Sequence, residues 1–318
     1  DEGLRDVRND LPEGYYRQLP KLAEGAFAGR PRVFALAWAF VAHCDSYFDP
    51  ATLRRFVSAF QRVQPLTIGE LWAVPIALRM VLLENLRRLA ERNVSGRAAR
   101  QEADALANEL LGVDRHAPEP TAFRRLAGRS LPTAFTVQLV QRLRDQGPEL
   151  TPALGWLNER PSAGETSADE IVRSELQDQG AMNVTVRNVI TSMRLISTFD
   201  WADFFESVSL VDEVLRAGSD FEAMDFATRD RYRHAIEGLS RGSGRSELAI
   251  AREAVSHAEA SRAPPGDRRA DPGFYLISKG RTLFEREIGY DVSPGRRLAR
   301  WYVSAATPNY LGTIAIVT

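Results

Sequence analysis

Four carboxylates lie beside aromatic residues in the first third of the chain, a combination that could act on a sugar. The acids are Asp45, Asp49, Glu70 and Glu84, and the aromatic residues are Trp38, Tyr47, Phe48 and Trp72. Glycosidases place a pair of carboxyl groups around the bond that they cleave. Asp49 and Glu70 also stand where helix caps are expected, and aromatic rings at helical spacing fill cores. We therefore predict no catalytic residue here and keep an α/α domain that binds or cleaves a carbohydrate with a carboxylate pair as the alternative.

Nucleotide-binding motifs are absent from the sequence. It contains neither G-x-x-x-x-G-K-[ST] nor a G-x-G-x-x-G that follows a predicted strand. No Asp-x-Asp pair occurs, and the nearest arrangement, Glu102-Ala-Asp104, lies on a predicted polar helix. Arg300-Trp301 matches the end of a Gln-x-x-Arg-Trp motif, but Arg297 occupies the glutamine position. These absences argue against a glycosyltransferase active site within this chain.

The residues that could bind a metal are scattered. No two of the four histidines have the i, i+4 spacing that places two ligands on one helix face. Cys44 is the only cysteine, so no intrachain disulfide or Cys-based zinc site can form, and we expect a buried, inert thiol. We predict no metal and no cofactor.

The overall charge excludes one class of partner. The formal net charge is −1, whereas a nucleic-acid-binding chain would need a marked basic excess or a basic stripe. Of the 41 basic residues only Lys21 and Lys279 are lysines, which we attribute to genome composition rather than to phosphate recognition. No nucleic-acid partner is expected.

Residues 31–92 are predicted to form the three helices around which the chain is organised. Thr67 and Glu70 have the spacing of a capping box that opens the third helix. Apolar residues then cover most of its circumference up to residue 92, so other helices must cover it. We expect Pro75 to kink this helix and residues 93–96 (Asn-Val-Ser-Gly) to end it.

The rest of the chain is also predicted to be helical. Further helices are predicted over residues 97–112, 133–147, 168–180, 184–199, 201–216, 226–241, 245–263, 274–277 and 282–288. No alternating strand pattern with hairpin turns is present. The predicted fold class is all-α, an irregular multi-helix bundle or α-hairpin array of roughly a dozen helices.

The predicted domain organisation has three parts. Residues 1–262 form a helical domain, in which residues 160–166 are the candidate boundary between two lobes. Residues 263–272 are rich in proline and charge and read as a linker. Residues 273–318 form a helical arm next to a membrane.

Residues near the end of the sequence predict contact with a membrane. Arg296, Arg297, Arg300 and Trp301 precede the apolar residues 310–318. Cations and interfacial aromatics beside an apolar segment are typical of membrane boundaries. Nine residues are too few to span a bilayer as a helix, so we expect the start of a spanning segment, with a packed amphipathic helix as the alternative. Because the sequence opens without Met, we expect a fragment or a processed chain.

Residues 40–92, 167–216 and 273–290 resemble the amino-terminal region of bacterial cyclic β-1,2-glucan synthases. The resemblance implies a very large inner-membrane enzyme that builds protein-linked β-1,2-glucan from UDP-glucose and closes it into a ring. It also implies that the catalytic regions lie downstream of the segment matched here. It therefore gives a parent enzyme without giving this chain an activity.

The expected function is that of a non-catalytic scaffold or regulatory segment on the cytoplasmic face of the bacterial inner membrane. Its partners would be other domains of the same polypeptide and, at the C-terminal end, the membrane surface. Arg187, Arg194 and Trp201 are the candidate docking residues; if buried, the two arginines would need acids such as Asp203 or Glu206. A stand-alone helical interaction module is a further alternative.

Overall fold

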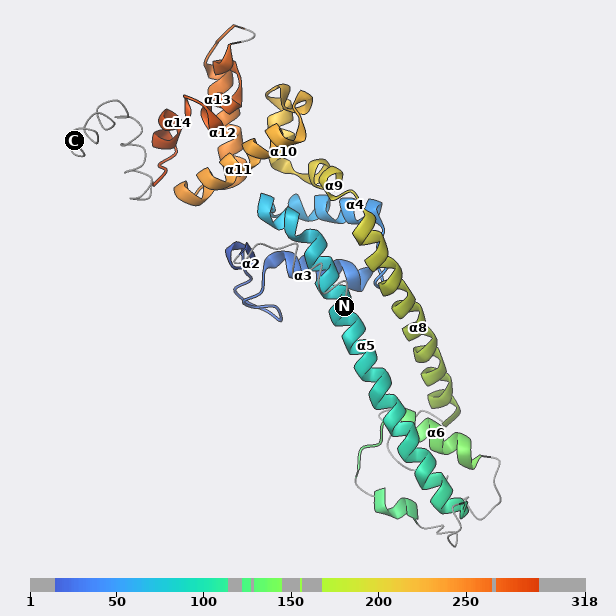
Figure 1. The fold of residues 1–318 in the computed structure, drawn as a ribbon. Helices are drawn as coiled ribbons and strands as arrows, with labels where there is room; N and C mark the ends of the chain where they lie inside the picture. Colours follow the sequence, from blue (N-terminus) through green and yellow to red (C-terminus); the bar gives the residue numbers. More distant parts are fainter. Residues whose placement is uncertain are drawn as a thin grey trace, which may run out of the picture. The chain divides into compact units, whose positions relative to one another are not determined.

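The fold is seen in a computed structural model that describes residues 15–113, 122–126, 129–144, 155, 168–264 and 267–291 (Figure 1). Helices and their connections make up this part of the chain. It contains no strand, only an isolated bridge between Lys21 and Pro31. The all-α prediction is confirmed.

The chain divides into two compact units. Unit 1 comprises Asp1–Leu53 and Val74–Phe199, and unit 2 comprises Arg54–Ala73 and Asp200–Thr318. The division runs through two helices, so each unit contains part of both. The predicted meeting point of two lobes near residues 160–166 lies outside the described residues and stays a prediction.

Unit 1 contains most of α5 and all of α8, the two longest helices of the described residues. Its described elements are α2 (Tyr15–Gln18), α3 (Arg32–His43), the start of α4 (Pro50–Gln61), most of α5 (Ile68–Leu111), η1 (Ala122–Leu126), α6 (Thr133–Leu143) and α8 (Ala168–Thr198). Small residues of α5, such as Ala103 and Ala107, pack against Phe135 and Leu139 of α6 in one buried cluster. Alanine allows the helices to approach closely, so the far end of α5 gains a core of its own.

Helix α5 is longer than predicted. It begins at the expected capping box but continues through Pro75 and through residues 93–96 to Leu111. The prediction that the helix ends at residues 93–96 is wrong. Asn and Gly each cost a helix up to about 1 kcal/mol relative to Ala. The buried Ala99–Leu110 contacts beyond the weak segment exceed that cost.

Helix α8 is likewise continuous, although the sequence predicted two helices separated near Gly180. Its second half is tied to the turn after α3. Ser192 Oγ accepts a hydrogen bond from Phe48 N (2.8 Å) and donates one to Ser46 O (2.7 Å). Thr185 Oγ1 donates to Asp45 Oδ1 (2.9 Å). These contacts hold the β-branched segment as helix, as predicted for residues 184–199.

Unit 2 consists of shorter helices. Besides the end of α4 and the start of α5, its described elements are α9 (Trp201–Val208), α10 (Leu210–Ala217), η3 (Asp220–Ala223), α11 (Phe226–Ser243), α12 (Glu247–Ala260), η4 (Arg268–Ala270), α13 (Pro272–Ile277) and α14 (Arg281–Glu287). The single helix predicted over residues 201–216 is two, because Ser209 takes an extended conformation and caps α10 through Asp212 N (3.1 Å).

Candidate functional site

Two of the four candidate carboxylates are helix caps. Asp49 Oδ2 accepts hydrogen bonds from the backbone N (2.8 Å) and hydroxyl (2.5 Å) of Thr52 at the start of α4. Glu70 is fully buried and its carboxylate accepts from Thr67 N (2.9 Å), while Glu70 N donates to Thr67 Oγ1 (3.2 Å). This is the reciprocal capping box that the sequence predicts.

The other two carboxylates are also engaged in local structure. Asp45 lies in a left-handed turn (φ 45°) and accepts from Thr185. Glu84 pairs with Arg87 (2.8 Å) and Arg88 (3.0 Å), and hydrogen bonds from these guanidinium groups lower the pKa of Glu84 to about 2. A general acid needs a raised pKa, so Glu84 is unsuited to that role.

The aromatic residues near these acids pack against protein. Trp38 contacts Phe34, and the Arg88 guanidinium lies 4.7 Å from the Trp38 ring centre. Trp72 stacks on Phe205 with ring centres 4.6 Å apart and planes at 14°. Phe48 is buried. Of the four rings, only Tyr47 is mostly exposed. The four rings therefore do not form an open aromatic surface on which a sugar could stack.

A metal site is not found within the described ranges, where no group of three or more His, Cys, Asp or Glu side chains is arranged to hold an ion. Cys44 is half-buried, and burial together with the nearby Asp49 raises the pKa of its thiol. A reactive cysteine needs the opposite shift.

The predicted docking residues fall on two helices. Arg187 and Arg194 lie seven residues apart on α8, both exposed, and neither forms an ion pair with another described residue. Trp201 is half-buried on α9 and packs edge-on against Phe204 (5.4 Å). The acids proposed as partners for the two arginines are used within unit 2: Asp203 pairs with Arg54, and Glu206 with arginines of α11.

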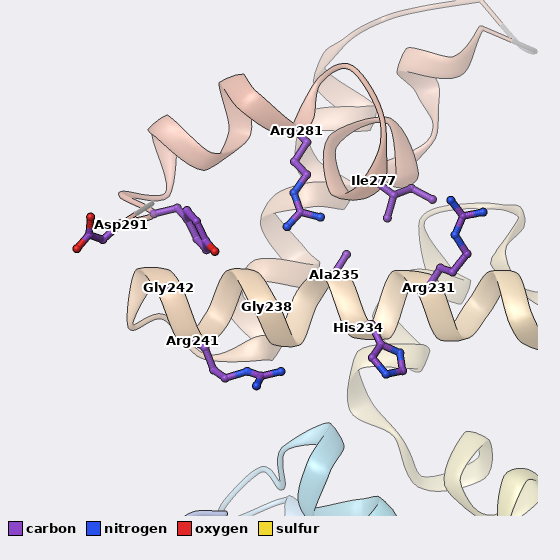
Figure 2. A pocket seen from close by; sticks show the side chains of 10 residues that line it. Arg231, His234, Ala235, Gly238, Arg241, Gly242, Ile277, Arg281 and Asp291 are labelled. Carbon is purple, nitrogen blue, oxygen red and sulfur yellow. The ribbon is translucent and has the colours of Figure 1, made fainter. Parts of the chain in front are cut away.

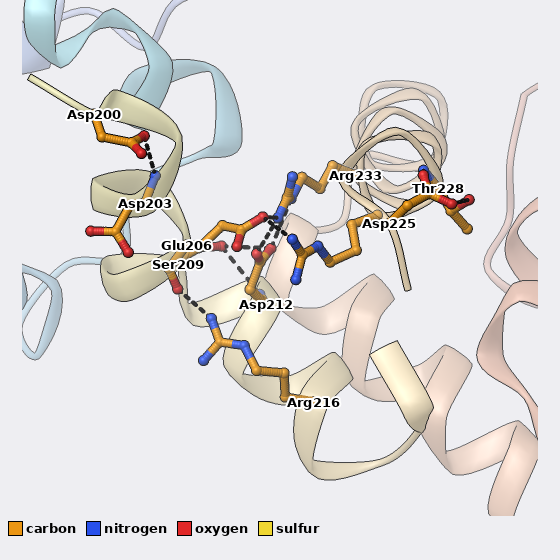
Figure 3. A network of polar contacts seen from close by, with 10 residues as sticks. Asp200, Asp203, Glu206, Ser209, Asp212, Arg216, Asp225, Thr228 and Arg233 are labelled. Carbon is orange, nitrogen blue, oxygen red and sulfur yellow. Dashed lines mark hydrogen bonds and ion pairs between the residues drawn. The ribbon is translucent and has the colours of Figure 1, made fainter. Parts of the chain in front are cut away.

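Unit 2 has a buried ion cluster that the sequence did not single out (Figure 3). Arg233 of α11 has no exposed surface, and its guanidinium contacts Asp212 through Nε (3.1 Å) and Nη2 (2.5 Å). Nη2 also contacts Glu206 Oε1 (2.9 Å), which Arg229 Nη2 approaches at 3.2 Å. Two acids and two arginines therefore neutralise each other where α9, α10 and α11 meet.

Aromatic rings enclose this cluster. The Arg233 guanidinium carbon lies 4.9 Å from the ring centre of Phe205, 5.3 Å from that of Phe226 and 5.8 Å from that of Phe221. A buried arginine gains from ring faces as well as from carboxylates. The sequence signal was available, because Arg233 precedes Ile236 by three residues and so shares the buried face of α11.

A second feature of unit 2 is a groove of about 740 Å³ between α11 and the α13–α14 segment, which we call the α11–α14 groove (Figure 2). Its lining includes Arg231, His234 and Arg241 of α11 and Arg281 of α14, against the single acid Asp291. Sequence patterns do not indicate this groove, because its two sides are some 40 residues apart along the chain.

A carboxylate with an unusual environment joins α12 to the start of α5. Glu247 Oε2 accepts a hydrogen bond from Ile68 N (2.6 Å). Burial raises its pKa to about 7, and the charges of Glu237 and Glu70 act in the same direction, against the Ile68 bond and Arg241. Glu247 therefore caps the start of α5 from the first turn of α12, whose own N-cap is Ser246.

The predicted membrane-contacting residues Arg296, Arg297, Arg300 and Trp301 lie outside the described residues. None of the described helices is long and apolar enough to cross a membrane.

Comparison with known proteins gives one informative match. The chain is 38% identical to the cyclic beta-(1,2)-glucan synthase NdvB of Rhizobium meliloti (strain 1021), over 328 aligned residues that cover 99% of this chain. It spans only 11% of that protein's length, so it resembles a fragment of it. No protein-family model matches the chain. The resemblance predicted from the sequence is thereby confirmed.

Proposed function

We propose that this chain is a non-catalytic helical scaffold of a membrane glycosyltransferase that makes cyclic β-1,2-glucan, and that it docks on other regions of the same polypeptide at the cytoplasmic face of the inner membrane. The observation that carries the proposal is the end-to-end similarity of the chain to about a tenth of NdvB. The engagement of Asp45, Asp49, Glu70 and Glu84 in local structure supports the non-catalytic part.

The best docking surface in unit 1 is the outer face of α8. Val184, Arg187, Ile190 and Arg194 recur at three- and four-residue steps and are all exposed. Val184 and Ile190, six residues apart on α8, retain 53% and 48% of their full exposure and so leave apolar surface on this helix. Two unpaired arginines beside them fit an apolar partner surface that carries carboxylates.

The test uses an NdvB-type synthase that lacks the segment corresponding to this chain, in membranes, with the purified chain added back. We expect the added chain to bind the truncated synthase and to restore cyclic glucan synthesis. The variant R187E/I190S/R194E should lose binding by at least about tenfold, since each arginine would change from attraction to repulsion. A matched control, R92E/R97E on the exposed middle of α5, should bind normally.

The catalytic alternative is tested directly. The chain is incubated with β-1,2-glucan oligomers and with UDP-glucose, and the products are separated by chromatography. We expect no change in oligomer length and no release of UDP. Turnover of either compound would replace the scaffold proposal with an enzyme.

A further inference from the structure

We propose that the α11–α14 groove binds a soluble diphosphate-type anion, held chiefly by Arg231 and Arg281. The proposal is independent of docking through α8, because the groove lies wholly within unit 2 and the α8 face within unit 1.

The charge of the groove favours an anion. Arg231 forms no ion pair with any described residue, and Arg281 reaches toward α11 from the opposite side (Figure 2). His234 and Arg241 also line the groove, but their side chains point away from Arg281 (Figure 2) and lie 3.1 Å from Asp230 and 3.6 Å from Glu237, respectively. Guanidinium groups match phosphate oxygens as bidentate donors, so a phosphate is the anion that this lining suits best.

Arg281 is held in place before any ligand arrives. Its Nε donates to Glu285 Oε1 (2.9 Å), and its Nη1 donates to Leu276 O (3.0 Å). Glu285 is only 3% exposed, so the anchor is buried. Nη2 makes no hydrogen bond to a described residue and is left for a ligand. A side chain fixed in this way loses little conformational entropy on binding.

The groove also has room for a ligand larger than a single phosphate. Its volume falls within the range of small-molecule sites. On α11 the floor consists of Ala235 and Gly238, and a Cβ placed on Gly238 would meet no atom within 4 Å. One end is closed by Tyr290, whose ring lies against Gly242, and by Asp291, whose N–H donates to Gly242 O (2.9 Å). The Asp291 carboxylate repels anions, so the phosphates belong toward Arg231 and Arg281.

The experiment is isothermal titration calorimetry of the 318-residue chain with pyrophosphate at low ionic strength. We expect one site, and at least about tenfold weaker binding for R231Q and for R281Q, since each substitution removes charge-assisted hydrogen bonds to the phosphate. G238L should also block binding while leaving the helix intact, because leucine is a better helix former than glycine. R252Q, an exposed arginine on α12 outside the groove, is the control and should bind like the parent chain.

Three results would overturn the proposal. One is the absence of any heat of binding by the folded parent chain. Another is binding that R231Q, R281Q and G238L leave unchanged. The third concerns phosphatidylcholine vesicles that contain phosphatidylglycerol: if R231Q/R281Q lowers vesicle binding but leaves pyrophosphate affinity unchanged, the groove takes a lipid headgroup rather than a soluble diphosphate.

Discussion

Arg233 is the residue on which the packing of unit 2 depends most directly. It neutralises Asp212 and Glu206, and Asp212 has no exposed surface. Removing one partner of a buried ion pair leaves the other charge uncompensated. We expect R233M to lower the free energy of unfolding by about 3–5 kcal/mol in urea denaturation.

A triple variant tests whether unpaired acids cause the loss of stability in R233M. In R233M/D212N/E206Q both acids become neutral amides, so much of the lost stability should return. R231M, two residues earlier on the exposed side of α11, should change stability by no more than about 0.5 kcal/mol. If the triple variant were no more stable than R233M, lost packing of the arginine on Phe205 would be the main effect rather than unpaired charge.

Glu247 should make stability depend on pH. Its pKa rises from an ordinary value of 4.5 in the unfolded chain to about 7 in the fold, chiefly through burial. The folded state therefore holds a proton that the unfolded state has lost between these two values, and this residue opposes folding more strongly as the pH rises through that window. E247Q removes the effect, and its amide oxygen can still accept from Ile68 N.

We expect E247Q to be about 1–3 kcal/mol more stable than the parent chain at about pH 8 and nearly equal to it at about pH 4. Urea denaturation at several pH values measures the difference. E253Q, on the same helix, is the comparison. A stability difference that did not grow with pH would contradict the raised pKa.

At the scale of elements, one buried hydroxyl makes two of the hydrogen bonds that tie α8 to the turn after α3. Ser192 is fully buried, and its Oγ serves both Phe48 N and Ser46 O. S192A leaves both backbone groups buried without a partner, so we expect a loss of about 1–3 kcal/mol. Hydrogen exchange at the Phe48 amide should accelerate. S197A, whose exposed hydroxyl bonds only to Met193 O of its own helix, should have little effect.

The elements show which sequence signals were sufficient. The caps at Asp49 and Thr67 depend on residues within three positions, and both are present. The breaks expected near Gly96 and Gly180 are absent, because a propensity cost of about 1 kcal/mol is local whereas the packing that outweighs it involves distant residues. Local preferences set where these helices begin, and tertiary contacts set where they stop.

The candidate sites were less predictable than the helices for the same reason. Arg233 pairs with acids 21 and 27 residues away, and Arg231 shares its groove with Arg281 from another helix. Helical periodicity places a residue on a face, but it does not say which other face that residue will meet. For Arg187 and Arg194 the sequence left open whether they are exposed or buried, and the structure shows both exposed.

At the scale of the whole molecule, a net charge of −1 means that any attraction to an acidic membrane must come from a local cluster rather than from the chain as a whole. The sequence offers Arg296, Arg297 and Arg300 as that cluster. Each basic residue near an acidic surface contributes about 1 kcal/mol, so R296E/R297E/R300E should bind phosphatidylglycerol-containing vesicles at least about 100-fold more weakly in co-sedimentation. The matched triple reversal R62E/R92E/R97E gives the same net charge from exposed positions in the described part of the chain. Equal losses in the two variants would assign vesicle binding to net charge, and only a loss confined to the first supports a membrane-facing C-terminal end.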